Sequence, residues 1–299
     1  MFKVPVLLIL YNKVDNTHDL FQILREVQPA KLYVAADGAR PHDRLDYVHC
    51  LQSRSVILPE WACTKKTFFK EEHLGKARML LQAMQWFFSQ EPEGIVLFDD
   101  TLPHLDFFFY CEELLEKYRK DKRVAHISGT NLARCRNKKN DSYYFSAYPQ
   151  TWGFASWQDR WEGFDLQMSG LDEPVFNQVL EEYVKNPAEK NYWLRRYEIL
   201  KEHELDIWEY QYIYHVWHLR ALSIIPRKNL IMNVGLKTKK RGVRRLAKQA
   251  YPILPLVHPQ QVERDTESDN HSFKYIYNKA FIKMFADWFN QYLLGKKTV

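Results

Sequence analysis

Short apolar runs alternate with amphipathic stretches through the first half of the chain. Residues 4–10, 31–36 and 95–97 are mainly apolar runs that suit buried strands. Between the first two, apolar side chains recur three or four positions apart, as at Leu20, Phe21 and Leu24. This alternation of strand and helix periodicity predicts successive β–α units. We therefore expect an α/β protein with a Rossmann-like, mainly parallel central sheet and helices on both faces.

The same periodicities predict the strands and helices of the rest of the chain. Further strands are predicted at residues 55–58, 63–69, 124–128, 222–225 and 230–234, and further helices from about 71 and at 106–118, 172–184, 189–201 and 207–219. Residues 272–294 carry an apolar stripe at helical spacing, with lysines off the stripe. Such an amphipathic helix either docks on the rest of the protein or lies in a membrane interface.

Two adjacent carboxylates end the apolar run within residues 94–103, which read GIVLFDDTLP. Open α/β sheets bind ligands beyond the carboxyl ends of their strands, so Asp99 and Asp100 lie where a site is expected. Carboxylate oxygens there suit a hard cation, Mg²⁺ or Mn²⁺, that carries a phosphorylated substrate. The alternative is a solvated turn in which Asp100 caps the next helix.

Polar side chains also follow other predicted elements. Asp37 and Arg40 come directly after the strand at 31–36, where Asp37 could hold a ribose or base and Arg40 a phosphate, or Asp37 could simply form a turn with Gly38. Gly75 and Lys76 lie where a helix begins, and a small residue with a cation at a helix start can receive a phosphate. Acidic residues just before them have a sufficient structural explanation in the helix dipole.

Aromatic residues make up 15% of the chain and include nine Trp. Many of them gather in residues 142–157, where Trp152 and Trp157 flank alternating large and small residues. This pattern is typical of a packed strand or of a platform on which a sugar ring stacks. Trp208, at the start of the helix at 207–219, is the third candidate for such a platform.

Charge and cysteine content limit the classes of ligand and the cellular compartment that we expect. The net charge of +6 suits an anionic ligand, nucleic acid or an acidic membrane surface. Four cysteines without paired spacing favour free thiols in a reducing compartment. The run at residues 4–11 is too short to span a membrane and lacks a cleavage site for a signal peptidase. We expect a cytoplasmic protein that could lie peripherally on the inner face of the membrane.

Basic residues dominate the segment after Gly235, which reads LKTKKRGVRR. A block of like charges is typical of a solvated segment. It can also bind membrane phospholipid or nucleic acid. In a third interpretation Lys237, Lys239, Lys240 and Arg241 close over a diphosphate and stabilise it as a leaving group.

A series of short motifs, in order, resembles one family. They are YN, AADG, EEHLG, LFDDTLPH, CEELLEKY, ISGTN, WGFASW, WEYQ, LSIIP, NLIMNVG and PLVHP. Together they resemble the bacterial nucleotide-diphospho-sugar transferases, GT-A-fold glycosyltransferases associated with surface polysaccharide synthesis. The resemblance covers residues 4 to about 258. It implies that Asp37 and Arg40 meet the nucleoside, and that Asp99 and Asp100 meet its ribose and a divalent ion.

Three departures from the family pattern stand out. Phe98 replaces the first acid of a Glu-Asp-Asp motif, and His73 stands where Asn is usual. The acidic residues and histidine that can close the metal site after Gly235 are replaced by the basic run. Metal binding is therefore expected to be weak, or partly replaced by basic side chains.

These observations predict a glycosyltransferase that moves a sugar from a nucleoside diphosphate to an acceptor hydroxyl. Glu209 is the candidate general base, where the family tends to have Asp, and direct attack would invert the anomeric centre. We expect a GT-A domain at residues 1–235, with a nucleotide half to about 130 and an acceptor half beyond it. Residues 236–299 form an appendage.

The expected partners are a nucleotide-sugar donor, a glycan or lipid-linked acceptor, and a membrane surface contacted by the C-terminal helix. Two alternatives remain open. One is a catalytically inactive relative that binds a sugar nucleotide or scaffolds a complex. The other is a phosphate-binding protein that acts on membrane or, less expected, on nucleic acid through residues 237–245.

Overall fold

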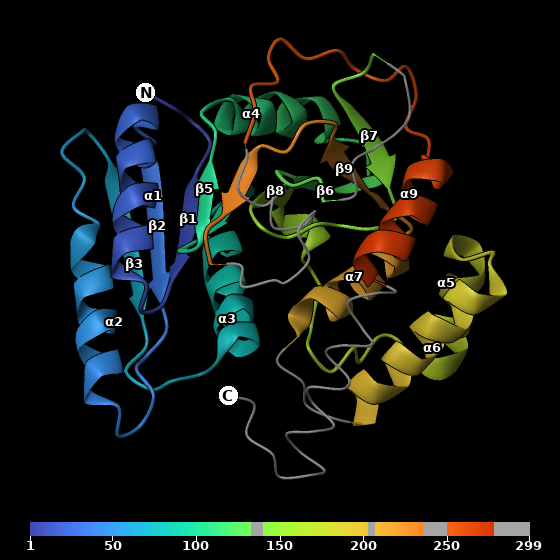
Figure 1. Ribbon diagram of the computed structural model, residues 1–299, viewed down its shortest axis with the longest axis horizontal. Coiled ribbons are helices and arrows are strands. Elements are labelled where there is room, and N and C mark those ends of the chain that lie inside the picture. Colours follow the sequence, from blue (N-terminus) through green and yellow to red (C-terminus); the bar gives the residue numbers. More distant parts are fainter. Residues whose placement is uncertain (133–139, 203–206, 236–249, 278–299) are drawn as a thin grey trace.

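An eight-stranded sheet forms the centre of the molecule (Figure 1). The computed structural model describes residues 1–132, 140–202, 207–235 and 250–277. The strand order is β3-β2-β1-β4-β8-β6-β9-β7. The strands are β1 (Val6–Leu10), β2 (Lys31–Ala36), β3 (Thr64–Phe69), β4 (Glu93–Phe98), β6 (Val124–Ser128), β7 (Tyr143–Ser146), β8 (Phe154–Trp157) and β9 (Leu222–Pro226).

The first four strands of the sheet run parallel, in the order expected of successive β–α units. β1 pairs with both β2 and β4, and β2 pairs with β3. β8 is antiparallel to β4 and β6, and β7 is antiparallel to β9. The carboxyl ends of β1, β2 and β4 consequently meet at one edge of the sheet. This arrangement confirms the predicted Rossmann-like α/β class.

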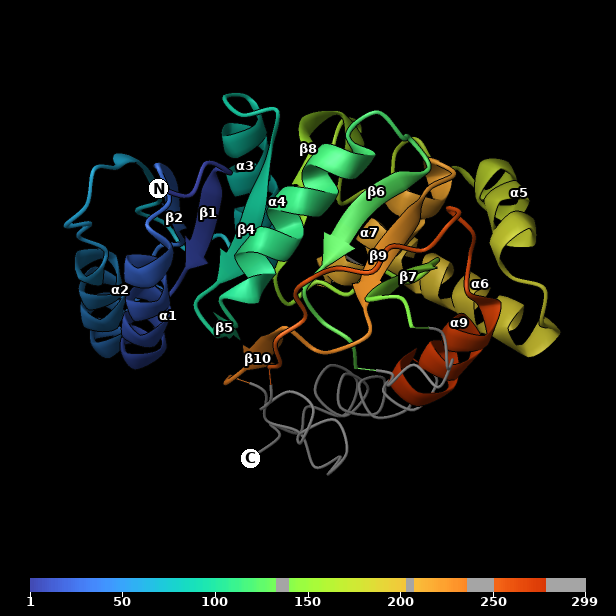
Figure 2. The same cartoon turned by 90° about the horizontal axis from the view of Figure 1, so that it is seen from above.

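Helices cover both faces of the sheet, because side chains of each strand alternate between them. Val6 and Leu8 of β1 pack in one core with α1 (Val14–Val27) and α4 (Asp106–Tyr118). Leu7 and Ile9 pack in a second core with α3 (Lys76–Phe88) and α7 (Trp208–His218). Figure 2 shows α4 and α3 on opposite sides of β4. The mainly exposed α2 (Arg44–Val56) lies beside α1.

A third apolar cluster lies at the far end of the molecule from α1 and α2 (Figure 1). It is formed by α5 (Glu173–Tyr183), α6 (Pro187–Glu202) and the outer side of α7. Trp193, Tyr214 and Trp217 are fully buried there. Since α7 contributes to this cluster and to the core under the sheet, it is held from two sides. A 3-10 turn, η1 (Gln158–Arg160), follows β8.

A small second sheet closes over the tips of the central strands. β5 (Thr101–Pro103) and β10 (Ile231–Asn233) pair antiparallel, with Asn233 opposite Thr101. In Figure 2 the two strands lie beyond the tips of β1 and β4. This pairing returns the chain to the residues that follow β4, because Val234 N–H donates to the Asp100 carbonyl at 2.9 Å.

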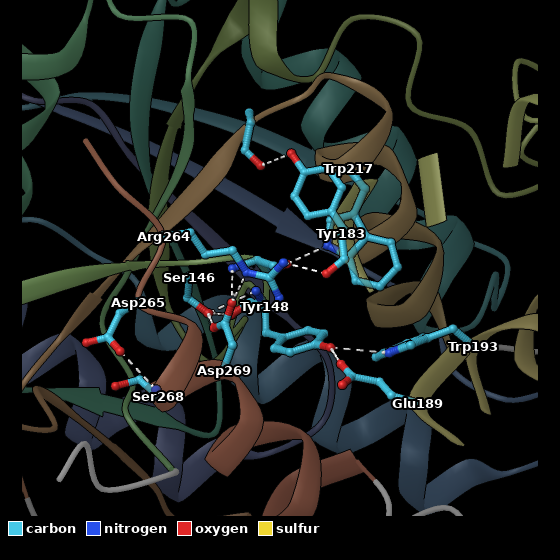
Figure 3. Close-up of polar contacts among 12 residues, drawn as sticks. Ser146, Tyr148, Tyr183, Glu189, Trp193, Trp217, Arg264, Asp265, Ser268 and Asp269 are labelled. Carbon is cyan, nitrogen blue, oxygen red and sulfur yellow. Dashed lines mark hydrogen bonds and ion pairs between the residues drawn. The ribbon is translucent and has the colours of Figure 1, made fainter. Parts of the chain in front are cut away.

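The C-terminal segment is tied to the sheet by buried polar contacts (Figure 3). It contains α9 (Thr266–Ser272) and a π-helical turn, η2 (Phe273–Tyr277). Asp269 is almost completely buried and accepts hydrogen bonds from Ser146 Oγ at 2.5 Å and Ala147 N–H at 3.0 Å. Arg264 Nε lies 2.5 Å from the Asp269 carboxylate. A buried ion pair thus joins α9 to the residues around the end of β7.

Some local predictions were wrong or incomplete. Residues 55–58 were predicted as a strand, but α2 continues to Val56. The buried residues of this helix are Asp46, Cys50 and Ser53, so the helix lacks the apolar stripe by which a sequence pattern indicates a helix. α3 begins at Lys76 rather than at 71. The predicted helix at 272–294 is π-helical at 273–277, and its residues 278–294 lie outside the described part of the chain. Among the described residues, no helix has the length and apolarity needed to cross a bilayer.

Candidate functional site

A cavity of about 380 Å³ lies at the sheet edge where β1, β2 and β4 end. Its size falls within the range of small-ligand sites. Loops after these strands supply one side of it, and the first residues of α3 and α7 supply the other. The lining residues are Ile9, Leu10, Tyr11, Lys13, Asp37, Arg40, His73, Gly75, Lys76, Met79, Phe98, Asp99, Asp100, Thr101, Thr151, Trp152, Trp208, Glu209 and Asn233.

Asp46, on the buried side of α2, fixes the loops that follow β1 and β2. Its carboxylate accepts hydrogen bonds from the Tyr11 hydroxyl, the Asn12 side-chain amide and the Arg40 backbone N–H. Burial opposes ionisation of Asp46, but these hydrogen bonds outweigh it and hold the pKa of the carboxyl below its usual value. The ionised Asp46 therefore positions Tyr11 and Arg40 at the rim of the cavity.

Asp99 and Asp100 lie at the tip of β4 and share one cation. Lys13 Nζ is 2.9 Å from Asp100 Oδ2 and 3.4 Å from Asp99 Oδ1. Asp99 also accepts the Tyr11 backbone N–H at 2.9 Å. Burial raises the pKa of Asp99, with Lys13 acting in the opposite sense. Burial would lower the pKa of Lys13, but the two carboxylates outweigh it and raise that pKa, so the ammonium keeps its proton.

Asp37 uses its carboxylate to organise the start of α3. It is buried and accepts backbone N–H groups from Gly38 at 2.9 Å, Leu74 at 2.8 Å and Gly75 at 3.0 Å. Gly38 permits this approach, since a Cβ there would lie 2.4 Å from the Glu72 carbonyl carbon. Gly75 takes a φ of 82°, which favours glycine. Asp37 lines the cavity as predicted, yet its oxygens already have partners within the fold.

Lys76 and Glu209 face each other across the cavity and form an ion pair. Lys76 is the first residue of α3, where the helix N-terminus favours an anion. Glu209 lies in the first turn of α7. α7 is positioned by ring stacking, because Tyr212 stacks on Trp161 with centroids 4.5 Å apart and planes 14° from parallel. The candidate base and the candidate phosphate-binding lysine are thus held in contact.

Rings and a guanidinium form the wall near β1. Tyr11 and His73 have ring centroids 5.2 Å apart, and the Arg40 guanidinium lies 5.6 Å from the centroid of the Tyr11 ring. Burial and the contact with Asp46 raise the pKa of Tyr11, so its hydroxyl stays protonated. Partly exposed rings and a guanidinium of this kind suit a planar ligand group.

The structure brings together most of the predicted site residues. Asp37, Arg40, Lys76, Asp99, Asp100, Trp152, Trp208 and Glu209 all line the one cavity. Trp208 is almost completely buried and packs against Phe98 and Phe154, so core packing accounts for most of its surface.

Trp157 is not brought to the cavity. It is buried in β8 opposite Glu93, the first residue of β4, and so lies at the other end of the strand. Because β8 is antiparallel to β4, only its beginning lies near the acidic tip. Trp157 therefore does not contribute to the proposed sugar platform. Lys237, Lys239, Lys240 and Arg241 lie outside the described residues.

The expected Mg²⁺ or Mn²⁺ does not find a ready donor set in the described part of the chain. No three Asp, Glu, His or Cys side chains gather there closely enough to hold a metal ion. Lys13 Nζ lies between the two carboxylates that would be ligands. A methyl group at Gly235 would lie 2.7 Å from Asp100 Oδ2, so backbone already covers one side of this oxygen. The acidic, histidine and cysteine side chains of the described residues, in this arrangement, do not supply three ligands for a divalent ion.

Sequence patterns missed several residues of the site. Lys13, Tyr11 and Asp46 were assigned no role in the site. Tyr11 belongs to the YN motif of the family resemblance, and both Tyr11 and Lys13 come within three positions of the end of a predicted strand; these signals could have indicated them. Asp46 had no such signal, because it lies within a helix that the pattern did not predict. Asn233 reaches the cavity only through the pairing of β10 with β5.

Comparison with known proteins gives distant structural likenesses alone. No family model and no curated protein matches the sequence. A mannosyltransferase from Pyrobaculum calidifontis, solved in complex with GDP-Man and Mn²⁺, is 12% identical with a TM-score of 0.37; the match covers 73% of this chain and 70% of that one. HddC from Yersinia pseudotuberculosis is 11% identical with a TM-score of 0.32 over 54% of this chain and 78% of its own. Likenesses this distant carry no argument about substrate or mechanism.

Proposed function

We propose that the protein is a nucleotide-sugar-dependent glycosyltransferase that transfers a sugar to an acceptor hydroxyl. The observation that carries this proposal is the cavity at the tips of β1, β2 and β4, which combines four carboxylates with three cations. Ligands of open α/β sheets bind at this edge. Cations and a helix N-terminus suit a diphosphate, and the wall of Tyr11 and His73 suits a nucleoside base.

The chain's residues divide the work of the reaction. The acceptor oxygen attacks the anomeric carbon, and the bond between that carbon and the diphosphate oxygen breaks. Its electron pair goes to the diphosphate, and the hydroxyl proton goes to the Glu209 carboxylate. Lys76 and Arg40 lie where their charges would stabilise the leaving diphosphate. Direct attack of this kind inverts the anomeric centre. The resemblance of the sequence motifs supports bacterial surface polysaccharide synthesis as the setting.

The ion pair between Lys76 and Glu209 suggests an order of binding. While the ion pair holds, the Lys76 ammonium occupies the Glu209 carboxylate that would have to meet the acceptor hydroxyl. A donor diphosphate competes for Lys76 and so releases Glu209 toward the acceptor. In this scheme the donor binds first, and the base is available only when the donor is in place.

Thermal shift with a panel of nucleoside-diphosphate sugars tests the proposal, because a ligand that binds only the folded protein raises its melting temperature. We expect one donor class to stabilise the wild type and to be hydrolysed or transferred slowly. Asp100→Ala should fold but lose both effects. Asp19→Ala removes an equal charge from the exposed side of α1 and should behave as wild type. Stabilisation by none of the donors would exclude the proposed function.

A further inference from the structure

Lys13 holds an unusual position for a lysine side chain. It is the residue before α1, and its ammonium lies 2.9 Å from Asp100 and 3.4 Å from Asp99. The Asp99 side chain is 8% exposed and that of Asp100 26%, so the contact is shielded from solvent on the protein side. The Lys13 side chain is 39% exposed and faces the cavity, which it lines. It is therefore accessible to a ligand while it holds both carboxylates.

The geometry leaves the ammonium able to bind a phosphate. An ammonium group has three N–H donors. Two are directed at Asp99 and Asp100. The third can reach an oxygen of a ligand in the cavity. Lys13 is also the N-cap residue of α1, and the helix dipole adds favourable potential for an anion at that end of the helix.

The Lys13 ammonium offsets the negative charge of Asp99 and Asp100. Without a cation, a donor diphosphate would approach two adjacent carboxylates and be repelled. Elsewhere in the cavity, Lys76 is paired with Glu209. Phe98, which stands beside the two acids, packs against Trp208 with ring centroids 6.3 Å apart and offers no charge. Among the residues that the structure describes, Lys13 is the cation that contacts both acids.

One oxygen of Asp100, Oδ2, is already crowded by its neighbours. Mg²⁺ usually keeps several of its waters in protein sites. Lys13 contacts Asp100 Oδ2, and the Gly235 backbone approaches the same oxygen so closely that a Cβ would lie 2.7 Å from it. Residues 236–249, which follow in the sequence, contain no Asp, Glu, His or Cys. This segment therefore adds no carboxylate, imidazole or thiolate ligand to the two carboxylates.

We propose that Lys13 is the resident cation of the Asp99–Asp100 site and binds the donor diphosphate directly, so that donor binding needs no divalent ion. This inference rests on the proposed function. Lys13 stays protonated throughout the transfer and stabilises the charge that the diphosphate gains when its bond to the sugar breaks. Asp99 and Asp100 hold the ammonium in place, which gives the acidic pair a role without metal coordination.

The first arm of the test uses Mn²⁺ alone, without nucleotide. Wild type should bind Mn²⁺ weakly, as followed by electron paramagnetic resonance of the free ion. Lys13→Gln releases two adjacent carboxylates and should bind it roughly tenfold more tightly or better. Lys120→Gln removes an equal charge from an exposed position and should match the wild type. Tight Mn²⁺ binding by the wild type, unchanged in Lys13→Gln, would overturn the inference.

The second arm measures binding of UDP, GDP, CDP and dTDP by calorimetry, in EDTA and in Mn²⁺. Wild type should bind one of them equally well in both buffers. Lys13→Gln should lose roughly tenfold or more in EDTA, whereas Lys13→Arg should keep most of the affinity because it keeps the charge. Melting curves of both variants report whether they fold.

The two possible failures differ in this arm. Wild-type binding that disappears in EDTA and returns with Mn²⁺ would overturn the role of Lys13 and leave the proposed function standing. No binding of any nucleoside diphosphate in either buffer would overturn the proposed function, and this inference with it.

Discussion

The roles proposed for Glu209 and Lys76 are both hindered by the contact between the two side chains. The side chain of Glu209 is 30% exposed, so a substrate can reach it, but its carboxylate is paired with the Lys76 ammonium. The pair joins the first residues of two helices that are 133 positions apart in the chain. Neither helix alone indicates the contact. The ion pair therefore connects the proposed donor side of the cavity to its proposed acceptor side.

Glu209→Gln tests the base at this scale. We expect the variant to bind the donor at least as well as wild type, since the amide keeps the shape of the side chain and no carboxylate competes for Lys76. The variant should lose about 10²–10⁴-fold in kcat because the amide cannot accept the proton. Turnover with a saturating donor, combined with calorimetry of donor binding, measures the two effects separately.

A control variant tests whether the loss of any one carboxylate lowers kcat. Glu198→Gln removes a carboxylate from the exposed side of α6 and should leave kcat unchanged. Equal turnover of Glu209→Gln and wild type would remove Glu209 from the mechanism. A loss of donor affinity without a loss of kcat would assign it to binding instead.

Strand β6 contains a fully buried histidine whose protonation opposes folding. His126 Nε2 lies 3.1 Å from the Gln150 carbonyl and donates to it, while Nδ1 accepts from the Tyr212 hydroxyl at 3.2 Å. The neutral ring therefore links β6 to α7 and to the loop before β8. Burial lowers the pKa of His126 from 6.5 to about 3. The element is thus built around an uncharged imidazole.

The expected pH dependence follows from that shift. Above pH 6.5 both the folded and the unfolded states carry a neutral His126, and its titration contributes nothing. Between pH 6.5 and about 3 the unfolded chain binds a proton that the folded state does not. The free energy of unfolding should therefore fall as the pH falls, by up to about 1.4 kcal/mol per pH unit from this group.

Urea unfolding at a series of pH values measures this slope. His126→Gln should be less stable than wild type at neutral pH, because it disturbs the two hydrogen bonds, but should lose less stability on acidification. His18→Gln, at an exposed position of α1, should keep the wild-type slope. An unchanged slope in His126→Gln would show that other groups account for the acid sensitivity.

The C-terminal segment is part of the packed molecule at least as far as Tyr277. Ile253 N–H donates to Asp106 Oδ2 at 2.7 Å at the start of α4, and Arg264 bridges to Phe145 of β7. The ion pair between Arg264 and Asp269 then holds α9 against the end of that strand (Figure 3). A domain boundary at residue 235 remains a prediction, and a helix at 278–294 lies outside the described residues.

Asp269→Ala tests how much this buried pair contributes to the whole molecule. It leaves Arg264 largely buried without its carboxylate, and we expect the free energy of unfolding to fall by about 3–5 kcal/mol. Urea denaturation followed by tryptophan fluorescence gives the value. Glu267→Ala removes an equal charge from the exposed side of α9 and should cost far less.

A double variant separates the ion pair from simple packing. Arg264→Met with Asp269→Leu removes both charges and should recover part of the stability lost in Asp269→Ala, because no uncompensated charge stays buried. A double variant that is less stable than Asp269→Ala would mean that the polar contacts of Arg264, including that with the Tyr183 carbonyl, matter more than the pair.

Local periodicity determined most of the strands and helices, because the signal for each lies within a few residues of the element itself. It placed β1, β2 and β4 and therefore predicted that Asp37, Asp99 and Asp100 gather at one edge of a parallel sheet. It failed for α2, whose buried side is polar, and for the first residues of α3. The resemblance of the motifs added Glu209, which periodicity alone would not have selected.

Only the tertiary structure decided which side chains meet. Lys13 reaches Asp100 across 87 positions and Lys76 reaches Glu209 across 133, so no local pattern contains either contact. The direction of β8 moved Trp157 away from the site, although its sequence pattern matched that of Trp152. Residue types and spacings determine which elements form, but the paths of the connections and the direction of each strand determine which charges come within reach of one another.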